Sequence, residues 1–280
     1  MKLRSMAIRR AVSSSMMLML WGATLLVLLP LVIIFWHIVT MGIESLNPGF
    51  FVNIPQPTGV PGGGMANGIA GSAIMITLAS LVGVPVGVSG AIYLSEYGSS
   101  RLATAIRFCA DVLAGIPSII TGMVVYSLLV LPMKGFSAIA GSCALSMIMI
   151  PIVLRTTEEQ LKMVPQSLRE ASLALGVPVW RTTLKVTLRS ALGGVTTGVL
   201  LAVARVAGET APLLFTALGN QFWSKRLTEP MAALPLQIFN FAISPYEDWH
   251  KLAWSGALVL VCIMFALSLG ARWLGRRRNG

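Results

Sequence analysis

The stretch PQSLREASLALG at residues 165–176 leads through VPVWRTTLKVTLRS into ALGGVTTGVLLAVARVAGETAPLLFTA at residues 191–217. Proline stands where a helix can start and glycine where it can end, so residues 165–176 predict a short helix. The apolar run at 191–217 is long enough to cross a membrane and carries two opposite charges, Arg205 and Glu209. The apolar face of the short helix recurs at helical spacing, at Leu161, Val164, Leu168, Ala171 and Leu175. A charged amphipathic element therefore leads directly into a membrane span.

The composition of the whole chain is that of an integral membrane protein. Of its 280 residues 55% are hydrophobic and 11% charged, against about 25% charged in an average soluble domain. Long uncharged runs are spread over the sequence and leave no polar block that is large enough for a separate soluble core. We therefore expect a single transmembrane domain over residues 1–280, with a polar loop at residues 155–190.

Six apolar segments predict six transmembrane helices, and hence an all-α, polytopic fold. The first is too long for the apolar region of a secretory signal, which has about 7–15 residues. The predicted spans cover residues 16–41, 69–94, 112–131, 136–154, 191–217 and 252–269.

The lysines and arginines orient these spans. Sixteen of the 21 fall at the two ends of the chain and in the second and fourth loops, four fall in the other loops, and Arg205 lies within a span. Such a bias marks the cytoplasmic side. We expect both termini and loop 155–190 to be cytoplasmic. The net charge of +11 therefore reflects orientation in the lipid bilayer, and a nucleic-acid partner is not expected.

Motifs for covalent or metal chemistry are not found in the sequence. The three cysteines have no metal-site spacing, there are only two histidines, and the glycine run at 62–64 is not followed by Gly-Lys-Ser/Thr. We expect no metal site, no cofactor and no catalytic residue in this chain. Energy from ATP must come from a partner.

The segment EASLALG at 170–176, followed after nine residues by VTL at 186–188, resembles the E-A-A loop of ABC-importer permeases, written E-A-A-x3-G-x9-I-x-L-P. This resemblance implies the type I permease fold of those importers. In that family the loop docks in a groove of the ATP-binding subunit, so the resemblance implies docking roles for Glu170, Ala171 and Gly176. The departures from the pattern are Ser172, Val186 and Arg189, the last standing in place of the proline.

Two further motifs, GIPS at 115–118 and ARVAGETAPL at 204–213, resemble the phosphate-specific permeases of ABC importers. The stretch GETAPLLFTALGNQF at 208–222 most resembles their A-type permease subunit (PstA type). The likeness runs from about residue 68 to the C-terminus. It implies a multi-pass protein of the bacterial cytoplasmic (inner) membrane that translocates inorganic phosphate. The implied substrate-pathway residues are Gly115, Pro117, Ser118, Arg205, Glu209 and Thr210.

The same resemblance implies a set of partners. They are a C-type phosphate permease subunit in a heterodimer, a dimer of ABC ATPase subunits that bind ATP and Mg²⁺, and a periplasmic phosphate-binding protein. Within the pathway, we expect Arg205 to donate hydrogen bonds to phosphate. We expect Glu209, one helical turn further on, to restrain the donor groups of Arg205.

Other interpretations stay open at this point. The chain could serve another oxyanion such as molybdate or sulfate, or act as a membrane scaffold for phosphate-dependent signalling. An intramembrane enzyme is least favoured. The amphipathic loop could lie on the membrane surface, the Gly and Pro residues of 115–122 could merely permit close packing, and Arg205 with Glu209 could be a structural ion pair.

Overall fold

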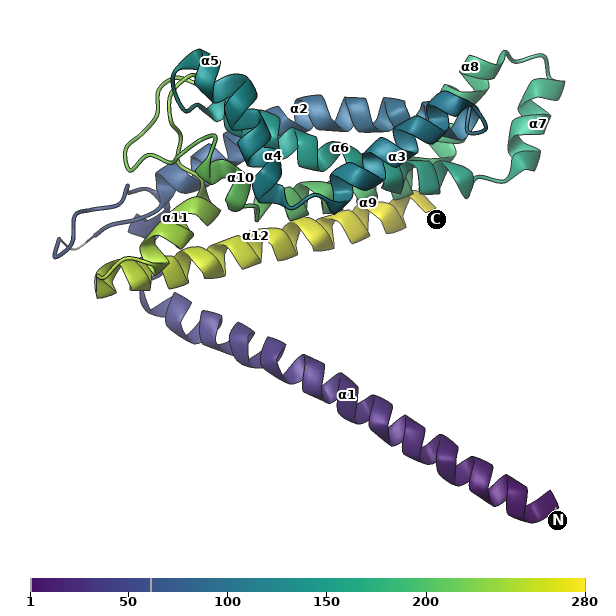
Figure 1. Cartoon of the computed structure of the whole chain (residues 1–280), viewed down its shortest axis with the longest axis horizontal. Helices are drawn as coiled ribbons and strands as arrows, with labels where there is room; N and C mark the ends of the chain where they lie inside the picture. Colours follow the sequence, from purple (N-terminus) through teal and green to yellow (C-terminus); the bar gives the residue numbers. More distant parts are fainter. Residues whose placement is uncertain (1, 61, 280) are drawn as a thin grey trace.

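Helices form most of the chain in the computed structural model, which describes residues 2–60 and 62–279 (Figure 1). The predicted all-α fold class is confirmed. Within the described residues, the only strand-like pairing is an isolated bridge between Leu218 and Met231. The α-helices are α1 (Lys2–Glu44), α2 (Ala66–Glu96), α3 (Arg101–Gly115), α4 (Ser118–Val125), α5 (Leu131–Met133), α6 (Ala138–Lys162), α7 (Gln166–Ala174), α8 (Val179–Thr182), α9 (Leu188–Ala207), α10 (Ala211–Leu214), α11 (Leu234–Ala242) and α12 (Glu247–Asn279). One 3₁₀-helix, η1 (Pro48–Phe51), and two turns of π-helix, η2 (Tyr126–Val130) and η3 (Thr183–Thr187), complete the set.

Five of the helical runs are long and apolar enough to cross a membrane. They lie in α1, α2, α6, α12 and the continuous run from α8 to α9. A sixth candidate is α3 together with the segment from Ser118 to Met133, which meets α3 at 105°. The predicted six-span layout is confirmed when this bent pair counts as one span. The span predicted over residues 112–131 differs in the structure, because the bent pair begins at Arg101 and the chain turns at Ile116 and Pro117.

The fifth predicted span, residues 191–217, is displaced in the structure. α8, η3 and α9 form one helical run from Val179 to Ala207. Arg189 lies within this run, and because arginine keeps the backbone N–H that proline lacks, the helix passes through it. The run ends where Gly208 follows, and Pro212 in the next turn cannot donate a helical hydrogen bond. The chain then forms a turn and the short helix α10.

The centre of the bundle is built from α2, α6 and α9. A Cβ atom on Gly87 of α2 would lie 2.8 Å from the Cβ atom of Val153 on α6, and one on Gly83 would lie 3.3 Å from that of Met149. Small residues at these places let two helix backbones approach closely in a membrane. The buried side chains around this contact include Met75, Leu145, Met149, Val153, Val206 and Leu213.

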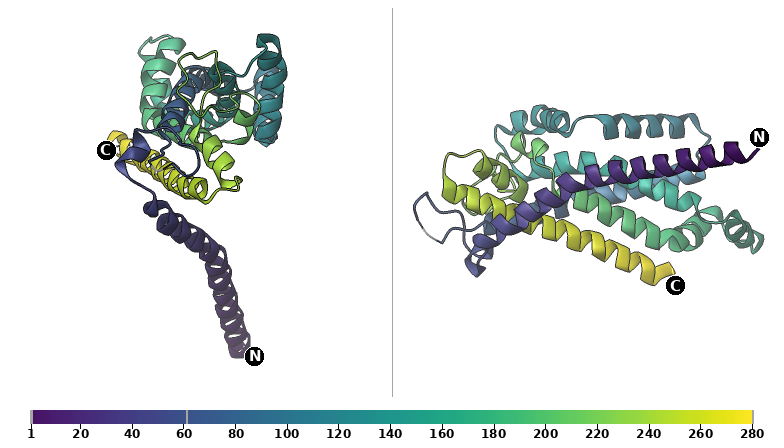
Figure 2. Two further views of the ribbon diagram at one scale, coloured as in Figure 1. Left: turned by 90° about the vertical axis from the view of Figure 1, so that its left-hand side faces the viewer. Right: turned by 90° about the horizontal axis from the view of Figure 1, so that it is seen from below.

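α1 diverges from the other helices and packs against α12 near its own C-terminal end. The His37 ring meets Trp254 edge-on with centroids 4.8 Å apart, and the Ser255 hydroxyl donates to the Gly42 carbonyl at 2.8 Å. The rest of α1 projects away from the bundle (Figures 1 and 2). There Trp21 is 66% exposed and Leu26 74%. Most of the apolar surface of α1 is therefore left uncovered by this chain.

The two ends of the bundle differ in construction. α7 and α8 lie at the same end as both termini (Figure 2). The opposite end holds the segment between α1 and α2, the loop after α10, and α11. There Phe50 packs in a buried cluster with Leu234 and Phe241 of α11 and Ala253 of α12. The helix α11 lies in a segment that the sequence predicts only as an external loop.

Candidate functional site

The first predicted pathway motif, at residues 115–118, forms a corner between two helices. α3 ends at Gly115, and Ile116 takes an extended conformation with φ −74° and ψ 133°. A following proline favours this conformation, because its ring clashes with a helical residue before it. α4 then begins at Ser118. Gly115 and Pro117 are exposed at the corner, and Ser118 is half-buried.

The second predicted motif lies at another corner, where α9 gives way to α10. Arg205 stands in the last turn of α9, and Gly208 follows the helix with φ −92° and ψ −1°. The N–H of Glu209 donates to the Val206 carbonyl, three residues back, at 3.1 Å, which makes the turn tight. Thr210 precedes α10 and is half-buried.

The two corners adjoin because α4 and α10 are in direct backbone contact. A Cβ atom on Gly122 would lie 2.6 Å from the Cα atom of Pro212 and 2.9 Å from its carbonyl oxygen. Ser118 precedes Gly122 by about one helical turn, and Thr210 stands two residues before Pro212. The fold thus brings together two motifs that lie far apart in the sequence (Figure 1).

Arg205 and Glu209 do not form the pair that their spacing predicts. Arg205 is exposed and Glu209 half-buried, and neither takes part in an ion pair within the described part of the chain. A spacing of four residues places two side chains side by side only where a helix continues between them. Here α9 ends at Ala207, so the expected restraint by Glu209 is absent from this structure.

The predicted docking helix forms as α7, and Gly176 ends it in the left-handed conformation, with φ +77°. The N–H of Gly176 donates to the Leu173 carbonyl at 2.9 Å, and the N–H of Val177 donates to the Ser172 carbonyl at 3.3 Å. These two bonds define the Schellman motif. No atom would crowd a Cβ at Gly176, so the backbone conformation, and not packing, calls for glycine.

Ser172, a departure from the family pattern, joins the two arms of this loop. It is buried, and its hydroxyl oxygen lies 2.9 Å from the hydroxyl oxygen of Thr182 on α8. An alanine at this position could not make the bond.

The face that α7 presents to its surroundings is partly apolar. Glu170 and Ala171 are exposed, Leu168 and Leu173 are each 44% exposed, and Leu175 is 84% exposed. α7 lies outside the candidate membrane spans, and the described part of this chain leaves these leucines uncovered. Gathered apolar side chains in such a place are typical of an interaction surface.

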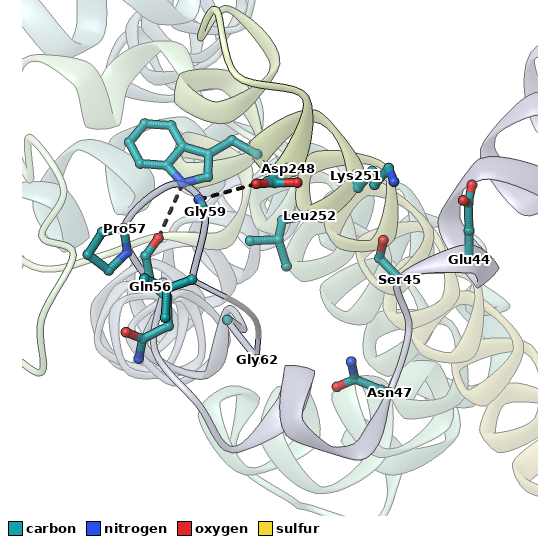
Figure 3. A pocket seen from close by; sticks show the side chains of 13 residues that line it. Glu44, Ser45, Asn47, Gln56, Pro57, Gly59, Gly62, Asp248, Lys251 and Leu252 are labelled. Atoms are coloured by element: carbon teal, nitrogen blue, oxygen red, sulfur yellow. Dashed lines mark hydrogen bonds between the residues drawn. The ribbon is translucent and has the colours of Figure 1, made fainter.

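A cavity of about 420 Å³ opens at the opposite end of the molecule, between the end of α1, the segment before α2 and the start of α12 (Figure 3). Asp248 on its wall accepts a hydrogen bond from the Gly59 N–H at 3.3 Å. Glu44 adds a second carboxylate, against one ammonium group from Lys251. Two carboxylates repel an oxyanion, so this wall does not suit phosphate. Within the described residues, no group of three His, Cys, Asp or Glu side chains could hold a metal ion.

Sequence reasoning missed a set of ion pairs near α7. Glu158 on α6, whose side chain is 2% exposed, is paired with Arg107 at 2.8 Å and with Lys162 at 2.7 Å. Arg169 on α7 pairs with Glu96 at 2.8 Å. The two long-range pairs join residues 51 and 73 positions apart, so no local spacing shows them. One signal was available in the sequence. The chain has only 10 acidic residues, and an acidic residue among the many basic residues of the predicted cytoplasmic loops is a candidate partner for one of them.

Comparisons with known proteins match most of the chain to permease components of transport systems. Residues 83–280 match the family described as "Binding-protein-dependent transport system inner membrane component". The chain is 48% identical over 265 residues to the phosphate transport system permease protein PstA of Yersinia pestis, which covers 94% of this chain and 88% of that protein. It is 34% identical over 289 residues to PstA 1 of Mycobacterium tuberculosis (strain ATCC 25618 / H37Rv), covering 99% of this chain and 92% of that one.

Solved structures share the fold at low sequence identity. A chain of the MetNI methionine ABC transporter, in an inward-facing conformation, matches with a TM-score of 0.61 and 17% identity over 76% of this chain and 94% of that chain. A chain of an amino acid ABC transporter solved with histidines gives a TM-score of 0.50 and 15% identity, covering 75% and 92%. The first of these likenesses confirms the predicted permease fold.

Proposed function

This chain belongs to the binding-protein-dependent transport system inner membrane components, as a phosphate transport permease subunit of an ABC importer, and from this premise we propose how it carries its substrate. The corners at Pro117 and Gly208 line the part of the phosphate pathway that this subunit contributes, and Arg205 is its anion-binding group. The chain performs no covalent chemistry, since ATP and Mg²⁺ belong to a separate ATPase subunit.

The observation that carries this proposal is the position of Arg205, which is exposed and makes no ion pair within the described residues. It stands three residues before the corner at Gly208, and that corner adjoins the one at Pro117 through the contact between Gly122 and Pro212.

Arg205 lies in the last turn of α9 and is exposed, and a charged side chain on a transmembrane helix is expected to face a water-filled cavity or another protein chain. The planar donors of Arg205 suit two oxygens of a tetrahedral anion at once. Ser118 lies at one corner and Thr210 at the other. Both add hydroxyl groups that can donate to phosphate.

The exposed surfaces support the proposed partners. The uncovered length of α1 and the exposed face that carries Arg205 fit a heterodimer with a C-type permease subunit, with the pathway between the two chains. The leucines of α7, with Glu170, Ala171 and Gly176, fit a dimer of ABC ATPase subunits. A periplasmic phosphate-binding protein delivers the substrate at the end that holds α11.

The orientation in the inner membrane follows from the distribution of basic residues. We place both termini and loop 155–190 in the cytoplasm and the segment between α1 and α2 in the periplasm. A cysteine introduced at Gly63 should react with an impermeant thiol reagent added to intact cells whose outer membrane is permeabilised, and one introduced at Gln166 should not. Both experiments use a chain whose three native cysteines are serine. Labelling at Gln166 without labelling at Gly63 would reverse the layout.

The substrate is tested by reconstitution of the chain with the C-type subunit, the ATPase and the phosphate-binding protein in liposomes. We expect phosphate-loaded binding protein to stimulate ATP hydrolysis and to drive phosphate into the lumen. Because the donors of Arg205 suit any tetrahedral oxyanion, parallel arms replace phosphate by sulfate or molybdate. Stimulation by one of these anions, with none by phosphate, would reject phosphate as the substrate.

A further inference from the structure

Two arginines from two different helices donate hydrogen bonds to the last turn of α2 and the residues just after it. Arg107 on α3 donates from one terminal nitrogen to the Gly98 carbonyl at 2.8 Å and from the other to the Leu94 carbonyl at 3.1 Å. Carbonyl groups at the end of a helix lack partners within it. Arg107 satisfies one such group, the Leu94 carbonyl, together with the carbonyl of Gly98 just beyond the helix, and thereby fastens α3 to the end of α2.

The same guanidinium also fastens α3 to α6. Its Nε–H donates to the Glu158 carboxylate at 2.9 Å, and Glu158 is almost completely buried. Arg155 pairs with Asp111 on α3 close by. Glu158 also pairs with Lys162 of its own helix at 2.7 Å, so the carboxylate keeps a cationic partner when Arg107 is replaced, and the contact with Arg107 serves to tie α6 to α3.

Arg169 makes the corresponding junction from α7. It donates to the Glu96 carboxylate at 2.8 Å, to the Ser95 hydroxyl at 3.2 Å and to the Leu161 carbonyl at 3.1 Å. Its side chain is 22% exposed and that of Glu96 is 18% exposed. Arg169 and Arg107 therefore hold neighbouring residues of a single short segment, Leu94–Gly98.

Gly98 makes room for this arrangement. A Cβ atom there would lie 2.9 Å from a terminal nitrogen of Arg107 and 2.7 Å from the Leu94 oxygen. A methyl group at this position would push the guanidinium away from the helix end. The absence of a side chain at Gly98 is thus a condition for the Arg107 junction.

We propose that Arg107 and Arg169 are positioning residues that carry the movement of a docked ATPase from α7, through the last turn of α2, to α3 and so to the corner at Pro117. The inference rests on the proposed docking of the ATPase at α7. α3 is an unbroken helix of 15 residues, about 22 Å long, and its far end is that corner. A displacement of α7 that pulls on the Leu94–Gly98 segment reaches the pathway by this route.

Two links in series behave differently from two independent structural contacts. If both arginines lie on one route, the loss of either interrupts it, and the loss of both adds little. If each merely stabilises its own junction, the two effects add, because the side chains share no partner residue. This difference separates a transmitting role from a structural one.

The test follows the corner itself, in the complete complex of both permease subunits with the ATPase dimer. Ile119 on α4, 40% exposed, is replaced by cysteine in a chain whose native cysteines are serine, and it carries an environment-sensitive fluorophore. The variants are Arg107→Gln, Arg169→Gln and their double mutant. Arg272→Gln, which removes an exposed arginine of α12, is the matched control. ATPase retention and basal ATP hydrolysis are measured on each complex.

We expect ATP to shift the fluorescence in the parent complex and in the Arg272→Gln complex. Both single variants should lose most of this shift while they keep the ATPase and its basal activity, and the double mutant should lose no more than the stronger single. Gly98→Ala should reproduce the Arg107→Gln result. A full shift in either single variant, or losses that add in the double mutant, would overturn the inference. Because the fluorescence reports movement and not cargo, an ATP-driven shift without phosphate transport rejects the proposed substrate alone.

Discussion

Phosphate uptake is expected to fall to background when Arg205 is replaced by glutamine, while the complex still assembles and hydrolyses ATP at its basal rate. Arg205 is exposed and makes no ion pair within the described chain, so its loss removes no buried contact. What it removes is the positive charge that stands three residues before the corner at Gly208. Hydrogen bonds to charged groups contribute about 1.5–3 kcal/mol each, and a bidentate pair with phosphate would lose two of them.

The measurement is uptake of radiolabelled phosphate by cells or liposomes, with the amount of assembled complex determined in the same preparation. Arg272→Gln is the control, because it changes the charge equally at an exposed site. Arg205→Lys should retain only weak uptake, since an ammonium group offers no planar fork. Failure of Arg205→Gln to assemble, with assembly and transport restored by a second change of Glu209 to glutamine, would assign the pair a structural role in the complex.

Replacement of Gly176 by valine is expected to remove the ATPase subunits from the purified complex and so to abolish uptake, while insertion of the chain in the membrane is unchanged. Gly176 has φ +77°, where a β-branched residue is an outlier and an L-residue costs about 1–2 kcal/mol. Both hydrogen bonds of the Schellman motif depend on this conformation. Without them the end of α7 shifts, and with it the leucines that the ATPase would contact.

Gly59→Val supplies a closely matched control for this variant. Gly59 has φ +82°, and no atom would crowd its Cβ, so the backbone strain is similar. It lies at the opposite end of the molecule, on the wall of the cavity (Figure 3). Co-purification of the ATPase is followed by gel densitometry. Equal loss from both variants would mean that strain alone disrupts the complex, and full retention with Gly176→Val would remove Gly176 from the docking surface.

Features that depend on neighbouring residues in the sequence could be predicted. Pro165 and Gly176 bracket α7 because the missing N–H of proline and the left-handed conformation of glycine act locally. The apolar runs predicted the spans, since hydrocarbon thickness fixes their length. GIPS at 115–118 forms a corner between α3 and α4 that the sequence did not predict, and its role in the pathway stays a prediction.

Features that depend on where a helix ends, or on residues far apart in the sequence, could not be predicted. The pairing of Arg205 with Glu209 assumed a helix through both residues, and α9 ends between them. Hydrophobicity continues past that end, so the pattern of the run did not reveal it. The junctions of Arg107 and Arg169 join residues 51 and 73 positions apart, and one sequence contains no information on which acid meets which base.

The packing of α1 against α12 joins a helix made early in translation to one made late. About 200 residues separate the end of α1 from the start of α12, and at 5–20 residues per second the ribosome needs roughly 10–40 s to make them. Throughout that interval α1 stands in the bilayer without α12. A helix can do so because its backbone hydrogen bonds are all internal. The contact between His37 and Trp254 therefore forms only after every other span has been synthesised, and it makes the seating of α1 a late step in the biogenesis of the subunit.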